Sequence, residues 1–272
     1  MTNVMAAING TPVGRTVLAV ADEVARVLDV GVEAVHVVEE GEGANISPET
    51  GAEAASRGIP VRMLEGDVEP ALVERARSHD VRAVVMGLRR TLAGSRPAGH
   101  VALGVIVGVR KPVIVVPPIT PSMFRLRKVL VPIQGRPADA LEDVTSIAKR
   151  ADLETVFLHI HDEWSVPSFE DQPHYDVEAW SQEFLARWVP GARGGETMEL
   201  RVGAPQEQIL EVARDVDADM IALGWAQDLS PGRATVVRWA LENTHVPVAL
   251  MPVARMGAAS RDRDEQDRRI SA

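Results

Sequence analysis

The sequence contains no cysteine, and it has few aromatic residues. The absence of cysteine excludes disulfide bonds, thiolate nucleophiles and cysteine-ligated metals from the chemistry of this chain. Phe, Trp and Tyr together make up 4% of the residues, whereas hydrophobic residues make up 46%. A core of ordinary size must therefore be built mainly from Val, Leu, Ile and Ala.

Long apolar segments are also absent. The longest apolar run, residues 101–109, is far shorter than the roughly 20 residues that a membrane-spanning helix needs. The first residues do not combine a basic segment with an apolar one, as a secretory signal would. The net charge of −10 disfavours a nucleic-acid backbone as partner, since phosphate binding needs a positive surface. The sequence thus predicts a cytoplasmic protein that binds neither a membrane nor a nucleic acid.

What the sequence does contain is one pattern that occurs twice. Residues 3–10 (Asn-Val-Met-Ala-Ala-Ile-Asn-Gly) recur as residues 128–135 (Lys-Val-Leu-Val-Pro-Ile-Gln-Gly), and residues 66–87 recur as 203–224 with matching apolar positions. The length of 272 residues leaves enough interior for two cores. We therefore expect two domains and a disordered charged tail, at residues 1–118, 125–254 and 255–272.

Strand and helix patterns alternate within each copy. In the first copy, short apolar runs predict strands at residues 4–8, 32–38, 60–64, 83–87 and 112–117. Helical spacing of apolar residues predicts helices at 13–28 and 68–79, whereas residues 39–59 give only a weak helical signal. Strand–helix–strand order implies parallel strands with right-handed crossovers. Strands that are apolar on both faces imply helices on both sides of the sheet.

The second copy differs from the first mainly in its connections. It carries extra sequence around residues 162–195, and this insert holds much of the scarce aromatic content. Trp180, Phe184 and Trp188 recur at four-residue spacing, which predicts one face of a helix. We expect this face to pack on the sheet, and a partner-binding face is the alternative. The proline-rich residues 117–122 should form a semi-rigid link between the copies.

Five short segments give each copy a resemblance to a universal stress protein domain. They are the first strand ending at Asn9-Gly10 or Gln134-Gly135, the second strand with His36-Val37 or His159-Ile160, the turn at Gly66 or Gly203, the fourth strand ending at Gly87 or Gly224, and the closing apolar strand. With this order met twice, the whole chain resembles a tandem universal stress protein. The resemblance implies an α/β fold with a five-stranded parallel sheet sandwiched by helices in each domain.

The resemblance also implies how two such domains associate. In this family the closing strands of two domains pair edge to edge, and here those strands are residues 113–116 and 248–251. The pairing can occur within one chain, where it hides two apolar edges. A homodimer is a further possibility.

Many members of the family bind ATP through a loop of the form Gly-x-x-Gly, nine residues, then Gly-Ser or Gly-Thr, directly after the fourth strand. Glycines let backbone N–H groups approach phosphate oxygens, and the hydroxyl adds a donor. In the first copy Gly87 and Gly99 match glycine positions, whereas Arg90 and His100 replace the second glycine and the hydroxyl. The arginines of this loop make it cationic, so that an anion still fits.

The loop of the second copy departs further from this form. Gln227 replaces the second glycine and Ala234 the third, although Thr235 keeps the hydroxyl. Trp225 and Asp228 are expected to add bulk and negative charge where phosphates would lie. We therefore do not expect this copy to bind a nucleotide in the manner of the family.

Both copies also lack the Asp that ATP-binding members commonly carry after the first strand, and have the amides Asn9 and Gln134 there. An amide donates and accepts hydrogen bonds, but it does not replace a carboxylate as a metal ligand. Two interpretations of the first domain stay open: weak binding of an adenine nucleotide, ATP or AMP, and a purely structural role in which the glycines only make tight turns. The residues expected at the two sites are Asn9, Gly10, Val37, Met86, Gly87, Arg90, Gly99, His100, Val101, Gln134, Ile160, Gly224 and Thr235.

Neither a metal site nor a catalytic residue is expected. His159, His161, Asp162 and Glu163 have the chemistry of metal ligands, but His36 occupies the place of His159 in the first copy without the others. This histidine is therefore interpreted as part of the scaffold. No Ser-His-Asp order, nucleophile elbow or Walker lysine is present. The sequence predicts a protein of stress response or signalling that acts by binding; the alternatives are a ligand-free dimerisation scaffold and, with less support, a slow ATPase.

Overall fold

The computed structural model describes residues 2–9, 11, 13–39, 46–88, 100–133, 147–148, 151–161, 196–228, 230 and 234–253. In the first half of the chain the elements are β1 (Asn3–Ala7), α1 (Gly14–Leu28), β2 (Gly31–Val38), α2 (Pro48–Ser56), β3 (Val61–Glu65), α3 (Val68–Arg77), β4 (Val81–Gly87), α4 (His100–Gly108) and β5 (Val113–Val116). In the second half they are β6 (Lys128–Ile133), β7 (Glu154–His161), β8 (Glu196–Val202), α7 (Pro205–Asp215), β9 (Met220–Trp225), α8 (Thr235–Asn243) and β10 (Val248–Pro252).

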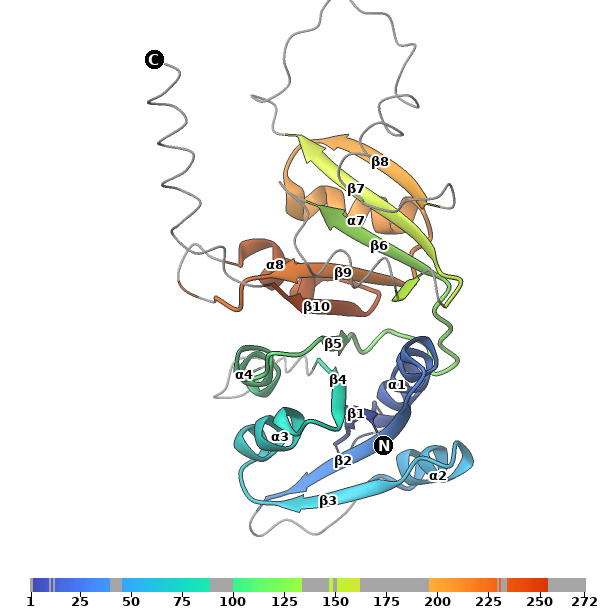
Figure 1. The fold of residues 1–272 in the computed structure, drawn as a ribbon, viewed down its shortest axis with the longest axis vertical. Helices are drawn as coiled ribbons and strands as arrows, with labels where there is room; N and C mark the ends of the chain where they lie inside the picture. Colours follow the sequence, from blue (N-terminus) through green and yellow to red (C-terminus); the bar gives the residue numbers. More distant parts are fainter. Residues whose placement is uncertain are drawn as a thin grey trace, which may run out of the picture.

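All ten strands form one sheet, in the order β3-β2-β1-β4-β5-β10-β9-β6-β7-β8 (Figure 1). Within each half every neighbouring pair is parallel. The two halves meet where β5 pairs with β10 in the antiparallel sense, with Val115 opposite Val248 and Ile114 opposite Ala249. Each half thus has the same strand order read outward from this seam, and its five strands are parallel.

Helices cover both faces of the sheet, as the apolar strands predicted. On one face, buried residues of α3, α4, α7 and α8, such as Leu72 and Leu241, form a single cluster with inward side chains of the strands. On the other face, α1 and α2 contribute residues such as Leu18 and Ala54 to a second cluster. The α/β architecture with a mostly parallel sheet between helices is therefore confirmed. None of the described helices is long and apolar enough to cross a bilayer.

The two outermost strands do not follow the prediction that strands are apolar and buried on both faces. In β3, Val61 and Met63 are 38% and 41% exposed, and in β8 Val202 is 52% exposed. A strand at the edge of a sheet has a neighbour on one side only. The prediction holds for the central strands: β1 buries Met5 completely on one face of the sheet and Val4 completely on the other.

Element boundaries shift by a few residues from those predicted. The strand predicted at 83–87 begins at Val81, and the helix predicted at 68–79 ends at Arg77. The segment with only a weak helical signal contains α2, which begins after Ser47, and the Ser47 side chain accepts a hydrogen bond from Thr50 N. Pro48 at the first position also favours a helix start.

The link between the halves is attached to α1 through a buried carboxylate. Glu23 is 4% exposed, and it accepts hydrogen bonds from Arg26, from the Arg125 guanidinium and from Leu126 N. Burial works to raise the pKa of Glu23, but the bonds from Leu126, Arg26 and Arg125 outweigh it and lower the pKa. Phe124, the residue before Arg125 in the same link, is also buried. The end of the link is therefore part of the packed first half.

Several sequence predictions lie outside the described residues. They concern the insert with its aromatic helix face, the charged tail, and parts of both candidate loops, at 162–195, 255–272, 89–99, 134–140 and 231–233. The division at residues 118 and 125 stays a prediction.

Candidate functional site

The carboxyl ends of β1, β2 and β4 meet at one edge of the first half. Ala7 lies opposite Val35 on one side and opposite Met86 on the other. Two residues further along, Asn9 therefore follows β1 at the level of Val37, and Gly87 ends β4 next to it. The order β2-β1-β4 makes the gap between β1 and β4 a topological switch point, the place where ligands of open α/β sheets bind.

The turn after β1 is held by short polar contacts. Asn9 Oδ1 accepts hydrogen bonds from Thr11 N (3.2 Å) and from Thr11 Oγ1 (2.6 Å). The Thr11 carbonyl in turn accepts from Thr50 Oγ1 of α2 and from Gly14 N. Thr50 is fully buried. Sequence reasoning missed Thr11 and Thr50; the only available signal was the capping sequence Ser47-Pro48, which places Thr50 in the first turn of α2.

Apolar side chains from the ends of β2 and β4 lie on the face of the sheet that α3 and α4 cover. Val37 is 8% exposed and Met86 is 4% exposed, and both belong to the cluster beneath α3 and α4. Val101, in the first turn of α4, packs against the same cluster. At Gly87 a Cβ atom would lie 3.4 Å from side-chain atoms of Val13 and Val17, which is ordinary contact. Crowding therefore does not by itself require glycine here.

Asn9, Val37, Met86 and Gly87 thus lie at the carboxyl ends of β1, β2 and β4, and Val101 lies in the first turn of α4. Other residues expected there lie outside the described residues: Gly10, Arg90, Gly99 and the side chain of His100. In the second half, Ile160 and Gly224 lie at the carboxyl ends of β7 and β9, and Thr235 begins α8. Gln134 lies outside the described residues.

The predicted scaffold histidines occupy equivalent places in the two halves. His36 Nδ1 lies 3.1 Å from the Ile8 carbonyl oxygen, and His159 Nδ1 lies 3.3 Å from that of Ile133. Each histidine therefore bonds the end of the first strand in its own half, which supports the scaffold interpretation. Within the described part of the chain, no group of three or more His, Asp or Glu side chains could hold a metal ion.

The loop between β9 and α8 has a left-handed backbone at two positions that the family form gives to glycine. Gln227 has φ 55° and Ala234 has φ 53°. These two residues keep the backbone that glycine would favour, although neither is glycine. The loop therefore has the backbone of a glycine loop at these points without its sequence.

Trp225 does not lie where it was expected. It was expected to obstruct the second loop, but it is only 6% exposed and packs in the core cluster with Leu223. Trp225 is the last residue of β9, and its side chain points inward because side chains alternate along a strand and Gly224 faces outward. Asp228 accepts a hydrogen bond from Ser230 N (3.0 Å), which closes a local turn.

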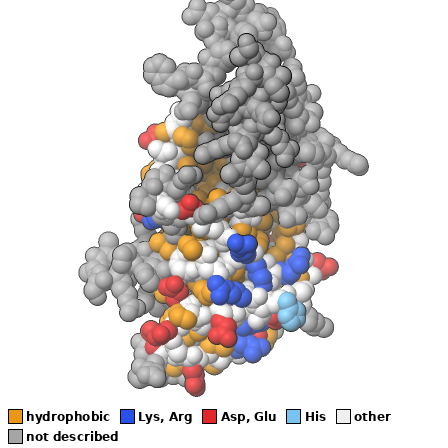
Figure 2. All heavy atoms as spheres, turned by 60° about the vertical axis from the view of Figure 1, so that its left-hand side comes forward, with side chains coloured by type: hydrophobic (Ala, Val, Ile, Leu, Met, Phe, Trp, Pro, Cys, Tyr) orange, Lys and Arg blue, Asp and Glu red, His pale blue; other side chains and the backbone are white. Residues whose placement is uncertain are grey.

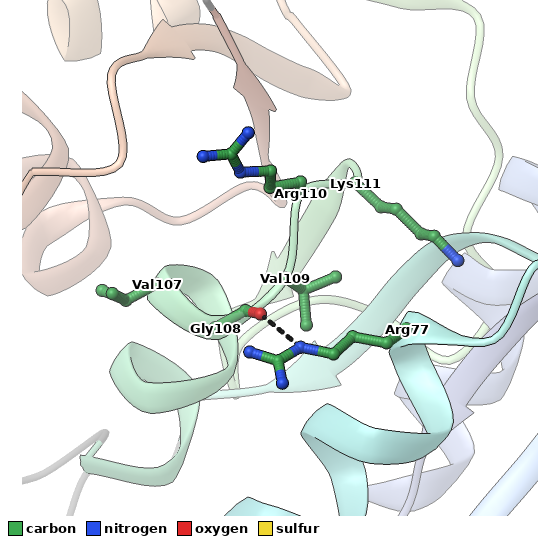
Figure 3. A pocket seen from close by; sticks show the side chains of 6 residues that line it. All are labelled: Arg77, Val107, Gly108, Val109, Arg110 and Lys111. Atoms are coloured by element: carbon green, nitrogen blue, oxygen red, sulfur yellow. Dashed lines mark hydrogen bonds between the residues drawn. The ribbon is translucent and has the colours of Figure 1, made fainter.

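A pocket of about 380 Å³ lies at the other end of the first half, lined by Arg77, Val107, Gly108, Val109, Arg110 and Lys111 (Figure 3). Arg77 Nε donates to the Gly108 carbonyl at the end of α4, at 3.1 Å. Lys111 Nζ donates to the Ser78 carbonyl at the end of α3. These cations complement helix C-termini, where carbonyls are unpaired and anions are disfavoured. The pocket is therefore not an extension of the switch-point site.

Charges near this pocket also act on one another. Burial lowers the pKa of Lys111, and so do the nearby guanidinium groups of Arg75 and Arg82, whereas Asp80 works in the opposite direction. Figure 2, in which this side of the molecule comes forward, shows Lys and Arg side chains gathered on the first half next to Asp and Glu. The local positive charge contrasts with the net charge of −10 of the whole chain.

Comparison with known proteins finds a family match in the second half of the chain. Residues 125–252 match the model of the Universal stress protein family. No curated protein sequence matches the chain. The family match does not extend to residues 1–124.

Solved structures match nearly the whole chain. A universal stress protein from Archaeoglobus fulgidus DSM 4304 is 16% identical, covers 92% of this chain and 98% of its own, and gives a TM-score of 0.67. A putative universal stress protein from Pseudomonas aeruginosa UCBPP-PA14 is 13% identical over 93% of this chain and 94% of its own, with a TM-score of 0.66. A universal stress protein in complex with cAMP matches 47% of this chain and 97% of its own, with 18% identity and a TM-score of 0.36. The first two matches show that the chain shares their fold.

Proposed function

We propose that the chain is a tandem universal stress protein that acts in stress response or signalling by binding, with an adenine nucleotide, ATP or AMP, in its first half. One observation carries the proposal: Asn9, Val37 and Gly87 converge at the switch point between β1 and β4. The sequence after Gly87 adds a loop with glycines and three arginines. Backbone N–H groups at glycines and arginine guanidinium groups both donate hydrogen bonds to phosphate oxygens. The second half keeps the fold, but its loop has lost two glycines.

A ligand-free scaffold is the second candidate, and a specific contact favours it. Asn9 Oδ1 already accepts two hydrogen bonds from Thr11, so this atom is engaged without any ligand. A slow ATPase has less support, because neither Asn9 nor Gln134 offers the carboxylate that a catalytic base or metal ligand would need.

Isothermal titration calorimetry of the full chain with ATP and with AMP tests the proposal. We expect saturable binding with one nucleotide per chain. Gly87 and Gly224 provide a matched pair, because each ends the fourth strand of its half. Gly87→Val should abolish binding, because the larger side chain would press on Val13 and Val17 at the start of α1, whereas Gly224→Val should leave binding unchanged.

Each alternative gives a different result in this experiment. No heat from the wild-type chain at millimolar nucleotide would contradict the proposal and favour the ligand-free scaffold. Loss of binding in Gly224→Val alone would move the site to the second half. Steady release of ADP from bound ATP would identify the slow ATPase.

A further inference from the structure

Gln227 makes contacts far outside its own half. It lies in the loop between β9 and α8, yet its side-chain Nε2 donates to the carbonyl oxygens of Val109 (2.6 Å) and Ile106 (3.3 Å). Ile106 lies in the last turn of α4 and Val109 directly follows this helix, 121 and 118 residues away along the chain. The last carbonyls of a helix have no partner within the helix, so this amide supplies a missing donor.

α4 is a helix that needs such support. Six of its nine residues are β-branched or glycine, types with low helix propensity: Val101, Gly104, Val105, Ile106, Val107 and Gly108. Its C-terminal carbonyls are bonded by side chains from two directions. Arg77 of α3 donates to the Gly108 carbonyl, and Gln227 of the second half donates to the carbonyls of Ile106 and Val109. The end of α4 is therefore shared between the halves.

The backbone of Gln227 adopts a conformation that is energetically unfavourable for a residue with a side chain. Its φ of 55° lies in the left-handed region, where any side chain is disfavoured relative to glycine. Glycine would fit this backbone better, but it has no amide to reach α4. The two hydrogen bonds give a physical reason for a long amide at this position.

The direction of the strands explains why a loop of one half meets a helix of the other. β4 and β5 are parallel, so α4 runs back from the carboxyl edge of the first half to its amino edge. Because β5 and β10 are antiparallel, that amino edge is also where the second-half strands end. With nine residues, α4 is about 13 Å long, so it extends from the end of the first-half loop to the loop after β9.

We propose that Gln227 is a positioning residue that holds the end of α4, and that its side chain thereby acts as a clamp between the two halves. Its effect reaches the switch point through α4, whose first residues directly follow the first-half loop. The α4 helix packs closely on α3, because a Cβ at Gly108 would lie 3.0 Å from Val73. Releasing the clamp should therefore loosen α4 from its C-terminal end.

Hydrogen–deuterium exchange of the full chain without any nucleotide tests this role. Gln227→Gly suits the left-handed backbone but removes the donor, and Gln227→Glu keeps the length but cannot donate at neutral pH. In both variants we expect amides of residues 104–110 to exchange about five- to tenfold faster, with α1 unchanged. The control is Gln208→Ala, since the Gln208 amide bonds only to Glu211 on its own helix among the contacts shown. It should leave α4 as in the wild type.

Two results would overturn the proposal. One is exchange in α4 that stays at the wild-type rate in both Gln227 variants. The other is an equal acceleration in α1 and α4, which would mean a general loss of stability and no local clamp. The clamp is measured without nucleotide, so a failure of ATP to bind would leave it standing. If ATP does bind, it should slow exchange at the start of α4 less in Gln227→Gly than in the wild type.

Discussion

At the residue scale, five described residues other than glycine adopt a left-handed backbone: Asp29, Asp152, Asp217, Gln227 and Ala234. Aspartate tolerates this conformation better than most residues, because its short polar side chain bonds locally. Asp29 and Asp152 also lie at matching places, each shortly before the second strand of its half. Ala234 has no such compensation, since its side chain makes no capping hydrogen bond at the start of α8.

Replacing Ala234 with glycine should therefore stabilise the protein. Ala234→Gly relieves the left-handed strain, and we expect the free energy of unfolding to rise by about 1 kcal/mol. Ala240→Gly is the control, because Ala240 is buried in the interior of α8, where glycine costs helix stability. Urea unfolding at pH 7 measures both. A lower midpoint for Ala234→Gly would show that the loop needs this methyl group.

Arg75 joins three elements of the first half. It donates to both oxygens of Asp80, at 3.0 and 2.8 Å, and through Nε to Glu33 of β2, at 2.8 Å. Its side chain is 10% exposed and that of Glu33 is 11% exposed, so these charges depend on each other for solvation. The network ties the end of α3 to β2 and to the start of β4.

Arg75→Ala should destabilise the protein strongly. It leaves the Glu33 carboxylate buried with one remaining partner, the exposed Arg62, and we expect a loss of about 3 kcal/mol. Arg82→Ala, at an exposed arginine of β4, should change stability by no more than about 0.5 kcal/mol. Thermal and urea unfolding compare the two variants. Equal effects would refute the special role of Arg75.

At the element scale, α1 and α2 pack closely together at Gly14. A Cβ atom there would lie 2.6 Å from Thr50 Cγ2 and 2.8 Å from Thr50 Oγ1. Thr50 is fully buried and also bonds Thr11, so it has little room to move. The absence of a side chain at Gly14 allows α2 to pack next to the turn after β1.

Gly14→Ala is expected to destabilise the protein by about 1–3 kcal/mol through overpacking against Thr50. Gly51→Ala is a matched substitution in α2, where a Cβ meets nothing within 4 Å. It should stabilise by about 0.5–1 kcal/mol, because alanine is the better helix former. Urea unfolding of the two variants should show shifts of opposite sign. A stabilising Gly14→Ala would mean that Thr50 can rotate away.

Much of the element pattern could be predicted from the sequence, because local periodicity determines it. The apolar runs placed β1, β2 and β4, and parallel order alone put Asn9, Val37 and Gly87 at one edge. Exposure of β3 and β8 could not be read from composition, since it depends on which strands lie outermost. The contact of Gln227 with the end of α4 could not be predicted either. Its acceptors are backbone carbonyls, which every residue has, and they lie more than a hundred residues away along the chain.

At the scale of the whole molecule, two carboxylates make the stability sensitive to acid. The hydrogen bond from Arg75 lowers the pKa of Asp80 to about 2, against the effect of burial, and contacts with Leu126, Arg26 and Arg125 lower the pKa of Glu23. Both groups are more acidic in the folded chain than in the unfolded chain. Their stabilising contribution is therefore complete above the unfolded pKa values, near 4, and is lost as the pH falls toward 2.

Urea midpoints measured between pH 7 and pH 3 should accordingly be steady at first and fall below about pH 4.5. Asp80→Asn removes one of the two titrating groups, and its midpoint should fall less steeply over the same interval. Asp217→Asn, at a residue for which the structure shows no ion pair among the described residues, should keep the wild-type slope. A wild-type slope in Asp80→Asn would contradict the assignment.

The antiparallel pairing of β5 with β10 also changes how many sheet edges the molecule leaves uncovered. Two separate five-stranded sheets would have four edge strands, whereas this ten-stranded sheet has two, β3 and β8. Because both halves belong to one chain, closing the seam is a unimolecular step, and its equilibrium does not depend on protein concentration. Separate single-domain chains would lose the same pairing on dilution below their dissociation constant. This chain keeps its two central edges covered however few copies are present.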